Sequence, residues 1–262
     1  SAVSRGLGDV YKRQELDENL RMITESVAAA KARGHESMFD CEHYFDGYKA
    51  NPDYALSCVQ AAHQGGASWV ILCDTNGGSL PDEVYEIVTA TKKAYPDVRL
   101  GIHCHNDSGV AVANSLAAVK AGARQVQGTL NGLGERCGNA DLITLIPALM
   151  LKQGYQTNIP KDKLSRLKPL SKMLDERLNR QSDAHAPYVG DAAFAHKGGL
   201  HASAAQKDSR TYEHIVPEIV GNQRSYLISD QTGRSNILAR FKEVGIELSL
   251  IHISEPTRHC TI

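Results

Sequence analysis

The 262-residue sequence lacks the features that mark several large classes of protein. It has no run of about 18 apolar residues that would predict a membrane-spanning helix, and its first residues lack the apolar core of a signal peptide. Lys and Arg number 29 against 30 Asp and Glu, so the basic excess typical of nucleic-acid-binding proteins is missing. Its six cysteines include no C-x-x-C pair. This pattern excludes a disulfide scaffold and favours free thiols in the cytoplasm.

What is present is the composition of a globular protein, with 42% hydrophobic and 23% charged residues. The two ends differ from the rest. Residues 1–14 (SAVSRGLGDVYKRQ) and 249–262 (SLIHISEPTRHCTI) do not continue the patterns of their neighbours. They resemble translated adapter sequence, and ordinary tails are the alternative. We therefore expect the native protein to occupy residues 15–248 and exclude both ends from fold reasoning.

Residues 15–153 alternate between helical and strand patterns. Strands are predicted at residues 37–42, 68–74, 99–105 and 124–130. Helices are predicted at residues 15–34, 52–64, 80–95, 108–121 and 140–151. Repeated βα units build a parallel sheet, either an open doubly wound sheet or a (β/α)8 barrel. No G-x-G-x-x-G follows the first strand, and polar residues end all four strands, where barrels place their active sites. We predict the α/β fold of the second half of a (β/α)8 TIM barrel.

The pattern changes after residue 153. Residues 154–160 are predicted as a linker, 163–179 as a helix and 181–190 as a loop. Short helical or loop pieces rich in Gly, His and Ser follow as far as residue 248. The sequence thus predicts a small linker subdomain at residues 154–248.

Two histidines lie two positions apart on the third predicted strand, so the rings of His103 and His105 project on the same face. At the carboxyl end of a barrel strand they can chelate one divalent ion, with ordinary polar packing as the alternative. The glycine-rich loop at residues 131–139 (NGLGERCGN) follows the fourth strand. It is expected to deliver three polar side chains to the site: Glu135, Arg136 and Asn139. Nitrogen and oxygen ligands of these kinds suit Zn2+ or Mn2+, and Mg2+ less well.

Further polar residues end the first two strands. Glu42 is a candidate for proton transfer, and the Thr75 hydroxyl is a candidate donor to a substrate carboxylate. Asp74 is expected to face the same barrel mouth, and helix capping is the interpretation we favour for it. Asn106 and Asp107 are predicted to support the site and to cap the next helix.

Together these stretches resemble the acyl-CoA Claisen-condensing enzymes that form citramalate, 2-isopropylmalate or homocitrate, in the DRE-TIM metallolyase group. The motifs are DTNGG (74–78), GIHCHNDSGVAVANSLAAV (101–119), NGLGERCGN (131–139), FAHKGGLHASA (194–204) and TYEHI (211–215). The stretch CEHYFDGYKANPDYAL (41–56) most resembles the citramalate-forming branch. The resemblance covers residues 15–248. It implies a (β/α)8 barrel, a linker subdomain and usually a C-terminal regulatory domain.

The resemblance also implies roles for the strand-end residues. His103 and His105 would be ligands of a divalent metal, Zn2+, Mn2+ or Mg2+, and Asn139 would be the loop residue at that metal. Thr75 would hold the carboxylate of the 2-oxo acid. Glu42 would handle protons while acetyl-CoA enolises.

The subdomain would complete this site. His201 would share the proton handling, and Tyr212 would reach into the barrel of a partner chain, which implies a homodimer. Ser203 stands where some relatives carry Asp, so that contact is not expected here. The family's Arg-Asp pair on the first barrel strand would lie outside this sequence.

The resulting hypothesis is the condensation of acetyl-CoA with pyruvate to give citramalate and CoA, in cytoplasmic branched-chain amino-acid biosynthesis leading to isoleucine. A 2-isopropylmalate or homocitrate synthase is the alternative. A non-catalytic scaffold derived from the barrel is the second alternative. The presence of the site residues speaks against it, because a scaffold needs none of them. Because four strands cannot close a barrel, we expect this chain alone to be inactive, with inner strand residues such as Val70, Leu72 and Ile102 uncovered.

Overall fold

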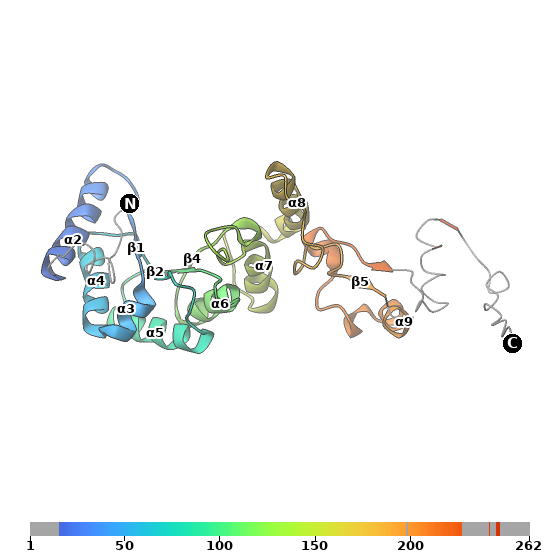
Figure 1. The fold of residues 1–262 in the computed structure, drawn as a ribbon, viewed down its shortest axis with the longest axis horizontal. Helices are drawn as coiled ribbons and strands as arrows, with labels where there is room; N and C mark the ends of the chain where they lie inside the picture. Colours follow the sequence, from blue (N-terminus) through green and yellow to red (C-terminus); the bar gives the residue numbers. More distant parts are fainter. Residues whose placement is uncertain (1–15, 198, 227–240, 242–244, 247–262) are drawn as a thin grey trace. The chain divides into compact units, whose positions relative to one another are not determined.

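The structure is a computed structural model that describes residues 16–197, 199–226, 241, 245 and 246. The chain divides into two compact units, Ser1–Tyr155 and Gln156–Ile262 (Figure 1). The segments at residues 1–14 and 249–262, for which an adapter origin is expected, lie outside the described residues. We propose the domain boundary at residues 153–154, close to this division.

The first unit is built on a four-stranded parallel sheet in the order β1-β2-β3-β4. Its strands are β1 (Met38–Cys41), β2 (Trp69–Asp74), β3 (Leu100–Cys104) and β4 (Gln125–Gln127). Its main helices are α2 (Leu16–Ala32), α3 (Tyr44–Ala50), α4 (Pro52–Gln64), α5 (Pro81–Ala94), α6 (Ala111–Ala121) and α7 (Leu142–Pro147). Figure 1 shows these helices packed along the strands. The predicted parallel βα repeat is therefore confirmed.

Local signals explain where several helices begin. Pro52 opens α4, and the Asn51 side chain accepts a hydrogen bond of 3.1 Å from the Tyr54 amide. Pro81 opens α5, and the Leu80 amide donates a 2.9 Å bond to the Glu83 carboxylate. Each helix start thus has an amide satisfied by a side chain.

The two faces of the sheet have different surroundings. The helix-packed face carries Val70, Leu72 and Ile102, which are at most 1% exposed. Our expectation that these residues are uncovered inner residues was wrong. Side chains alternate along a strand, and Ile102 therefore points away from the face that carries His103. We call the opposite side the inner face; it carries Asp40, Ile71, His103 and Gln127. The strand register pairs Asp40 with Ile71, and His103 with Gln127 in the next row of the same face.

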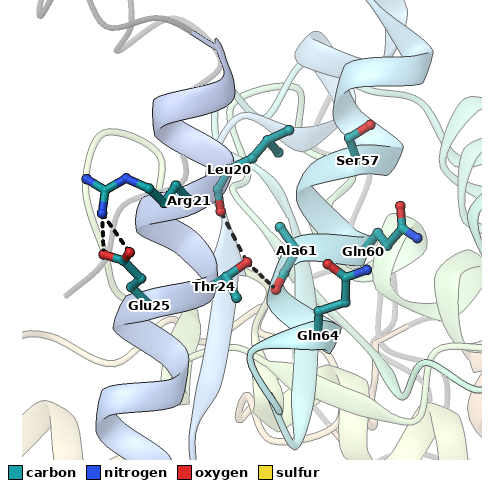
Figure 2. Close-up of a pocket in the computed structure, with 8 residues that line it drawn as sticks. All are labelled: Leu20, Arg21, Thr24, Glu25, Ser57, Gln60, Ala61 and Gln64. Atoms are coloured by element: carbon teal, nitrogen blue, oxygen red, sulfur yellow. Dashed lines mark hydrogen bonds and ion pairs between the residues drawn. The ribbon is translucent and has the colours of Figure 1, made fainter.

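Helices α2 and α4 pack closely on the outside of this unit. Figure 2 shows a groove between them, where the Thr24 hydroxyl bonds the carbonyl oxygens of Leu20 at 3.2 Å and Ala61 at 3.1 Å. Gly65 follows α4, and a Cβ added there would lie 2.7 Å from the Thr24 carbonyl oxygen and 2.9 Å from Cβ of Val27. Absence of a side chain at Gly65 therefore permits the close approach of α2.

Gly65→Ala is expected to lower the free energy of unfolding by about 1–3 kcal/mol, because the new methyl group must displace backbone of α2. Gly47→Ala is the matched control: Gly47 lies inside α3 with nothing within 4 Å of an added Cβ. That change should leave stability unchanged or raise it by up to about 1 kcal/mol. Thermal unfolding of both variants checks the pair, and equal shifts would contradict the packing argument.

The second unit has shorter elements. The predicted helix at 163–179 consists of a 3-10 segment (Lys161–Arg166) followed by α8 (Leu167–Arg177). Strands β5 (Ala195–His196) and β6 (Ser225–Tyr226) form a small parallel pair that was not predicted, and α9 (Gly199–Lys207) follows β5. Among the described residues of both units, no helix is long and apolar enough to cross a membrane.

Candidate active site

The loop after β4 folds back onto the end of β3. The Asn106 amide donates to the Gly138 carbonyl at 2.9 Å, and the Ala140 amide donates to the Cys104 carbonyl at 2.9 Å. Gly138 has a φ of 86°, and a Cβ there would overlap the carbonyl oxygen of Gly132. These constraints place Asn139 beside His105 in a bridge between the two backbones.

His103 and His105 converge as their spacing predicts. Their Nε2 atoms are 3.4 Å apart, and the rings meet edge to face with centroids 5.1 Å apart. Two imidazole nitrogens, each about 2.1 Å from one ion at about the tetrahedral angle, are separated by about 3.4 Å. Burial, and then the neighbouring His103 and Arg136, lower the pKa of His105, which favours the neutral form that binds metals. The pair therefore fits a shared divalent ion.

Asn139 adds an oxygen to this fit. Its Oδ1 atom is buried and has no hydrogen-bond partner among the residues that the structure describes. A buried acceptor without a partner costs free energy, and a bound cation would relieve that cost. Across the described part of the chain, no group of three or more His, Cys, Asp or Glu side chains is placed to hold a metal. The two histidines and the amide would therefore form only part of a coordination shell.

Arg136 ties the loop to two neighbouring strands. Its guanidinium donates to both Asp107 carboxylate oxygens at 2.7 and 2.9 Å, and to the Thr75 carbonyl at 2.7 Å. The Arg136 hydrogen bonds lower the pKa of Asp107. Asp107 therefore binds the loop. Our expectation that it caps α6 was wrong. Asn106 takes that role, because its side chain accepts a hydrogen bond from the Ala111 amide at 3.1 Å. The Glu135 side chain is 86% exposed, so it is not delivered to the histidines.

Thr75 and Asp74 lie on opposite sides of the end of β2. The Thr75 hydroxyl oxygen accepts a 2.8 Å bond from the His43 amide, which leaves its own proton free to donate to a ligand. Asp74 is 1% exposed and points to the helix-packed face, contrary to our expectation that it faces the barrel mouth. Its carboxylate accepts from the Ser79 amide and the Asn114 side chain, each at 3.4 Å. Asp74 therefore has a structural position, the role we favoured.

Glu42 follows β1 directly and is half-buried. Its negative charge acts to raise the pKa of both His105 and Cys73, as a smaller effect than burial in each case. The strand ends of the first unit thus bring together the two histidines and the loop, while Glu42 and Thr75 follow the ends of β1 and β2.

His201 and Tyr212 come together within the second unit. Their ring centroids are 4.3 Å apart, and both side chains are exposed. Ser203 lies on the same helix as His201.

An ion cluster beside Tyr212 was missed by the sequence analysis. The Glu213 carboxylate, whose side chain is 2% exposed, bonds His196 Nε2 at 2.9 Å and Arg224 Nη2 at 2.5 Å, with a second contact from Arg224 Nε. Burial alone would raise the pKa of Glu213, but the bonds from Arg224 and His196 outweigh it and lower that pKa. The cluster anchors the segment that carries Tyr212. Its partners are far apart in sequence, so only the density of titratable residues hinted at it.

Comparison with known proteins identifies the family. The family profile described as HMGL-like matches residues 2–170. The chain belongs to the HMGL-like family. The profile described as homocitrate synthase post-HMGL domain-like matches residues 188–261. The resemblance inferred from the motifs is therefore confirmed.

Among curated relatives, citramalate synthases are more similar to this chain than homocitrate and 2-isopropylmalate synthases are. The chain is 55% identical to the (R)-citramalate synthase of Aquifex aeolicus over 233 residues, and 51% identical to that of Synechocystis sp. over 240 residues. Each match covers 89% of this chain, which spans 44% of the length of either relative. Homocitrate and 2-isopropylmalate synthases are less similar, at 32–37% identity.

A solved structure supports the fold. The HMG-CoA lyase of Bacillus subtilis aligns with a TM-score of 0.56 at 21% identity, covering 64% of this chain and 58% of that one. This likeness and the family profile confirm the predicted TIM-barrel class of α/β fold.

Proposed function

We propose that the protein carrying this chain condenses acetyl-CoA with pyruvate and water to give citramalate and CoA. The observation that carries the proposal is the convergence of His103 and His105 at 3.4 Å, beside the unpartnered Asn139 oxygen. The identity of 51–55% to citramalate synthases, against 32–37% for the other synthases, supports pyruvate as the oxo acid.

A divalent cation fits the residues present. His103, His105 and Asn139 would hold it, and their nitrogen-rich donor set favours Zn2+ or Mn2+ over Mg2+. When bound, such an ion supplies Lewis-acid chemistry at a carbonyl.

Residues of this chain would bind the substrate and transfer protons. The free proton of the Thr75 hydroxyl would donate to the carboxylate of pyruvate and orient it. Glu42 would accept a proton from the methyl group of acetyl-CoA, so that the resulting enolate carbon attacks the ketone carbon. His201 would share this proton handling, with Tyr212 against its ring. Hydrolysis of the thioester then releases CoA.

The assembly and cellular setting are part of the proposal. We propose a homodimer in which Tyr212 serves the barrel of the partner chain, which is supported by its 45% exposure. The near-balanced composition and the absence of a C-x-x-C pair support a cytoplasmic enzyme. Its product would enter isoleucine biosynthesis.

A panel of oxo acids tests the reaction. The full-length protein, loaded with Zn2+ or Mn2+, is assayed with acetyl-CoA and pyruvate, 2-oxoisovalerate or 2-oxoglutarate, by thiol release and product mass. We expect kcat/KM for pyruvate to exceed the others by about tenfold or more, since each misplaced methylene costs about 1–3 kcal/mol. A preference for 2-oxoisovalerate would indicate a 2-isopropylmalate synthase, and a preference for 2-oxoglutarate a homocitrate synthase. No thiol release with any of them would contradict the condensation.

A further inference from the structure

The inner face of the sheet carries a hydrogen bond between its two outer strands. Gln127 of β4 donates from Nε2 to Oδ1 of Asp40 in β1 at 3.1 Å, although β2 and β3 lie between them. Neighbouring strands are about 4.8 Å apart, so in a flat sheet these two strands would be separated by about 14 Å. The sheet therefore curves enough for side chains from its two edges to meet over the inner face.

The same Gln127 side chain also contacts the histidine pair. Its Oε1 atom lies 3.0 Å from Nδ1 of His103, and the strand register places these two residues side by side. The contacts form a continuous chain from Asp40 through Gln127 and His103 to Nε2 of His105.

The chemical groups in this series of contacts set the direction of every hydrogen bond in it. An ionised carboxylate only accepts, so the Gln127 amide nitrogen must face Asp40 and the amide oxygen must face His103. An amide oxygen also only accepts, so Nδ1 of His103 must carry the hydrogen. The Nε2 atom of His103 then holds the lone pair, and it is this atom that faces His105.

The other histidine lacks such support. The Nδ1 atom of His105 is buried without a hydrogen-bond partner among the described residues. The contacts from Asp40 and Gln127 therefore support only one histidine of the pair. Removing them should alter the tautomer and orientation of His103 and leave His105 as it is.

We propose that Gln127, held in place by Asp40, is the positioning residue of His103. It fixes the tautomer and ring orientation that present Nε2 to a cation shared with His105. This inference rests on the proposed metal-binding role of the two histidines. Residues that hold a ligating histidine by its second nitrogen typically change metal affinity by about 10–100-fold when they are removed.

The first test measures Zn2+ affinity in the metal-free full-length protein, by competition with a chromophoric chelator. Gln127→Leu removes the acceptor at Nδ1 and is expected to weaken Zn2+ binding by about 10–100-fold. Gln125→Leu is the matched control, because Gln125 lies two residues earlier on the same strand and its buried Oε1 atom already has no partner. The control should bind Zn2+ with nearly the parental affinity.

A second test exchanges the amide of Gln127 and the carboxylate of Asp40. It does not require that the fold accept a leucine at position 127. In Gln127→Glu, the new carboxylate lies against the Asp40 carboxylate, and neither can donate a hydrogen bond to the other. Adding Asp40→Asn should then improve Zn2+ binding, because the new amide can donate to the new carboxylate. Asp40→Asn alone keeps an acceptor for Gln127 and should change affinity little. The two changes are therefore expected to be strongly coupled. Asp40→Asn should raise the Zn2+ affinity at least fivefold in the Gln127→Glu variant and change it little in the parent.

Nitrogen NMR of the metal-free protein gives a readout independent of activity. In the parent and in Gln125→Leu, Nδ1 of His103 should carry the hydrogen, whereas Gln127→Leu should show a mixture of tautomers. If Zn2+ binds as well to His103→Ala as to the parent, the metal role of the histidines is wrong. If binding depends on His103, but Gln127→Leu matches its control in affinity and tautomer, the positioning role is wrong.

Discussion

Replacing His103 by alanine is expected to remove the proposed divalent metal and to abolish the proposed condensation. The two Nε2 atoms are 3.4 Å apart and Asn139 supplies one unpartnered oxygen, so each histidine is a large share of the donors that this chain offers. Four-ligand zinc sites bind with about 10–16 kcal/mol in total, or about 3 kcal/mol per ligand. Loss of one ligand should therefore weaken binding by about 100-fold or more.

The measurement pairs metal content with turnover in the full-length protein. Metal is counted by emission spectrometry after gel filtration, and thiol release is followed with pyruvate. His63→Ala is the matched control, because His63 lies exposed on α4 and belongs to no cluster at the strand ends. Stoichiometric metal and near-parental turnover in His103→Ala would show that the ion is bound elsewhere.

The regular elements of the first unit could be predicted because their signals are local. The strand β2 is a continuous run of apolar residues, and Pro52 and Pro81 open the helices that flank it. Helix α3 was missed because it has only seven residues and begins after His43, which has a φ of 57° and provides no side-chain cap. Its stability comes from burial of Tyr44 and Phe45, which depends on tertiary packing.

The candidate site was predictable to the extent that it depends on strand alternation. The spacing of His103 and His105 predicted a shared face, and their rings do converge. The same alternation, applied with care, would also have placed Ile102 and Asp74 on the opposite face. The link from Gln127 to Asp40 could not be predicted, since it depends on how strongly the sheet curves.

Loop contacts were harder still to foresee. The glycine spacing of residues 131–139 indicated a close approach, but not that Arg136 would bind Asp107 and the Thr75 carbonyl while Glu135 points to solvent. Arg136 has a φ of 54°, a conformation that sequence propensities do not favour outside glycine. Such contacts are selected by the tertiary fold as a whole.

The proton-transfer role assigned to Glu42 makes the second large prediction. Glu42→Gln keeps the size and shape of the side chain but removes its basic oxygen. General base catalysis contributes about 10²–10⁴-fold, so kcat should fall by that factor. Pyruvate binding and metal content should be almost unchanged, because the proposed ligands and Thr75 remain in place.

The KM for pyruvate, the metal content and kcat are therefore measured together, because a distorted site would alter all three and loss of a base would alter kcat alone. Glu36→Gln is the matched control, since Glu36 is exposed just before β1 and should leave kcat unchanged. Exchange of the methyl protons of acetyl-CoA with deuterated water would give a direct reading of the step. A fall in kcat of less than tenfold with parental exchange would move the base to another residue, and His201, whose ring lies against Tyr212, would be tested next.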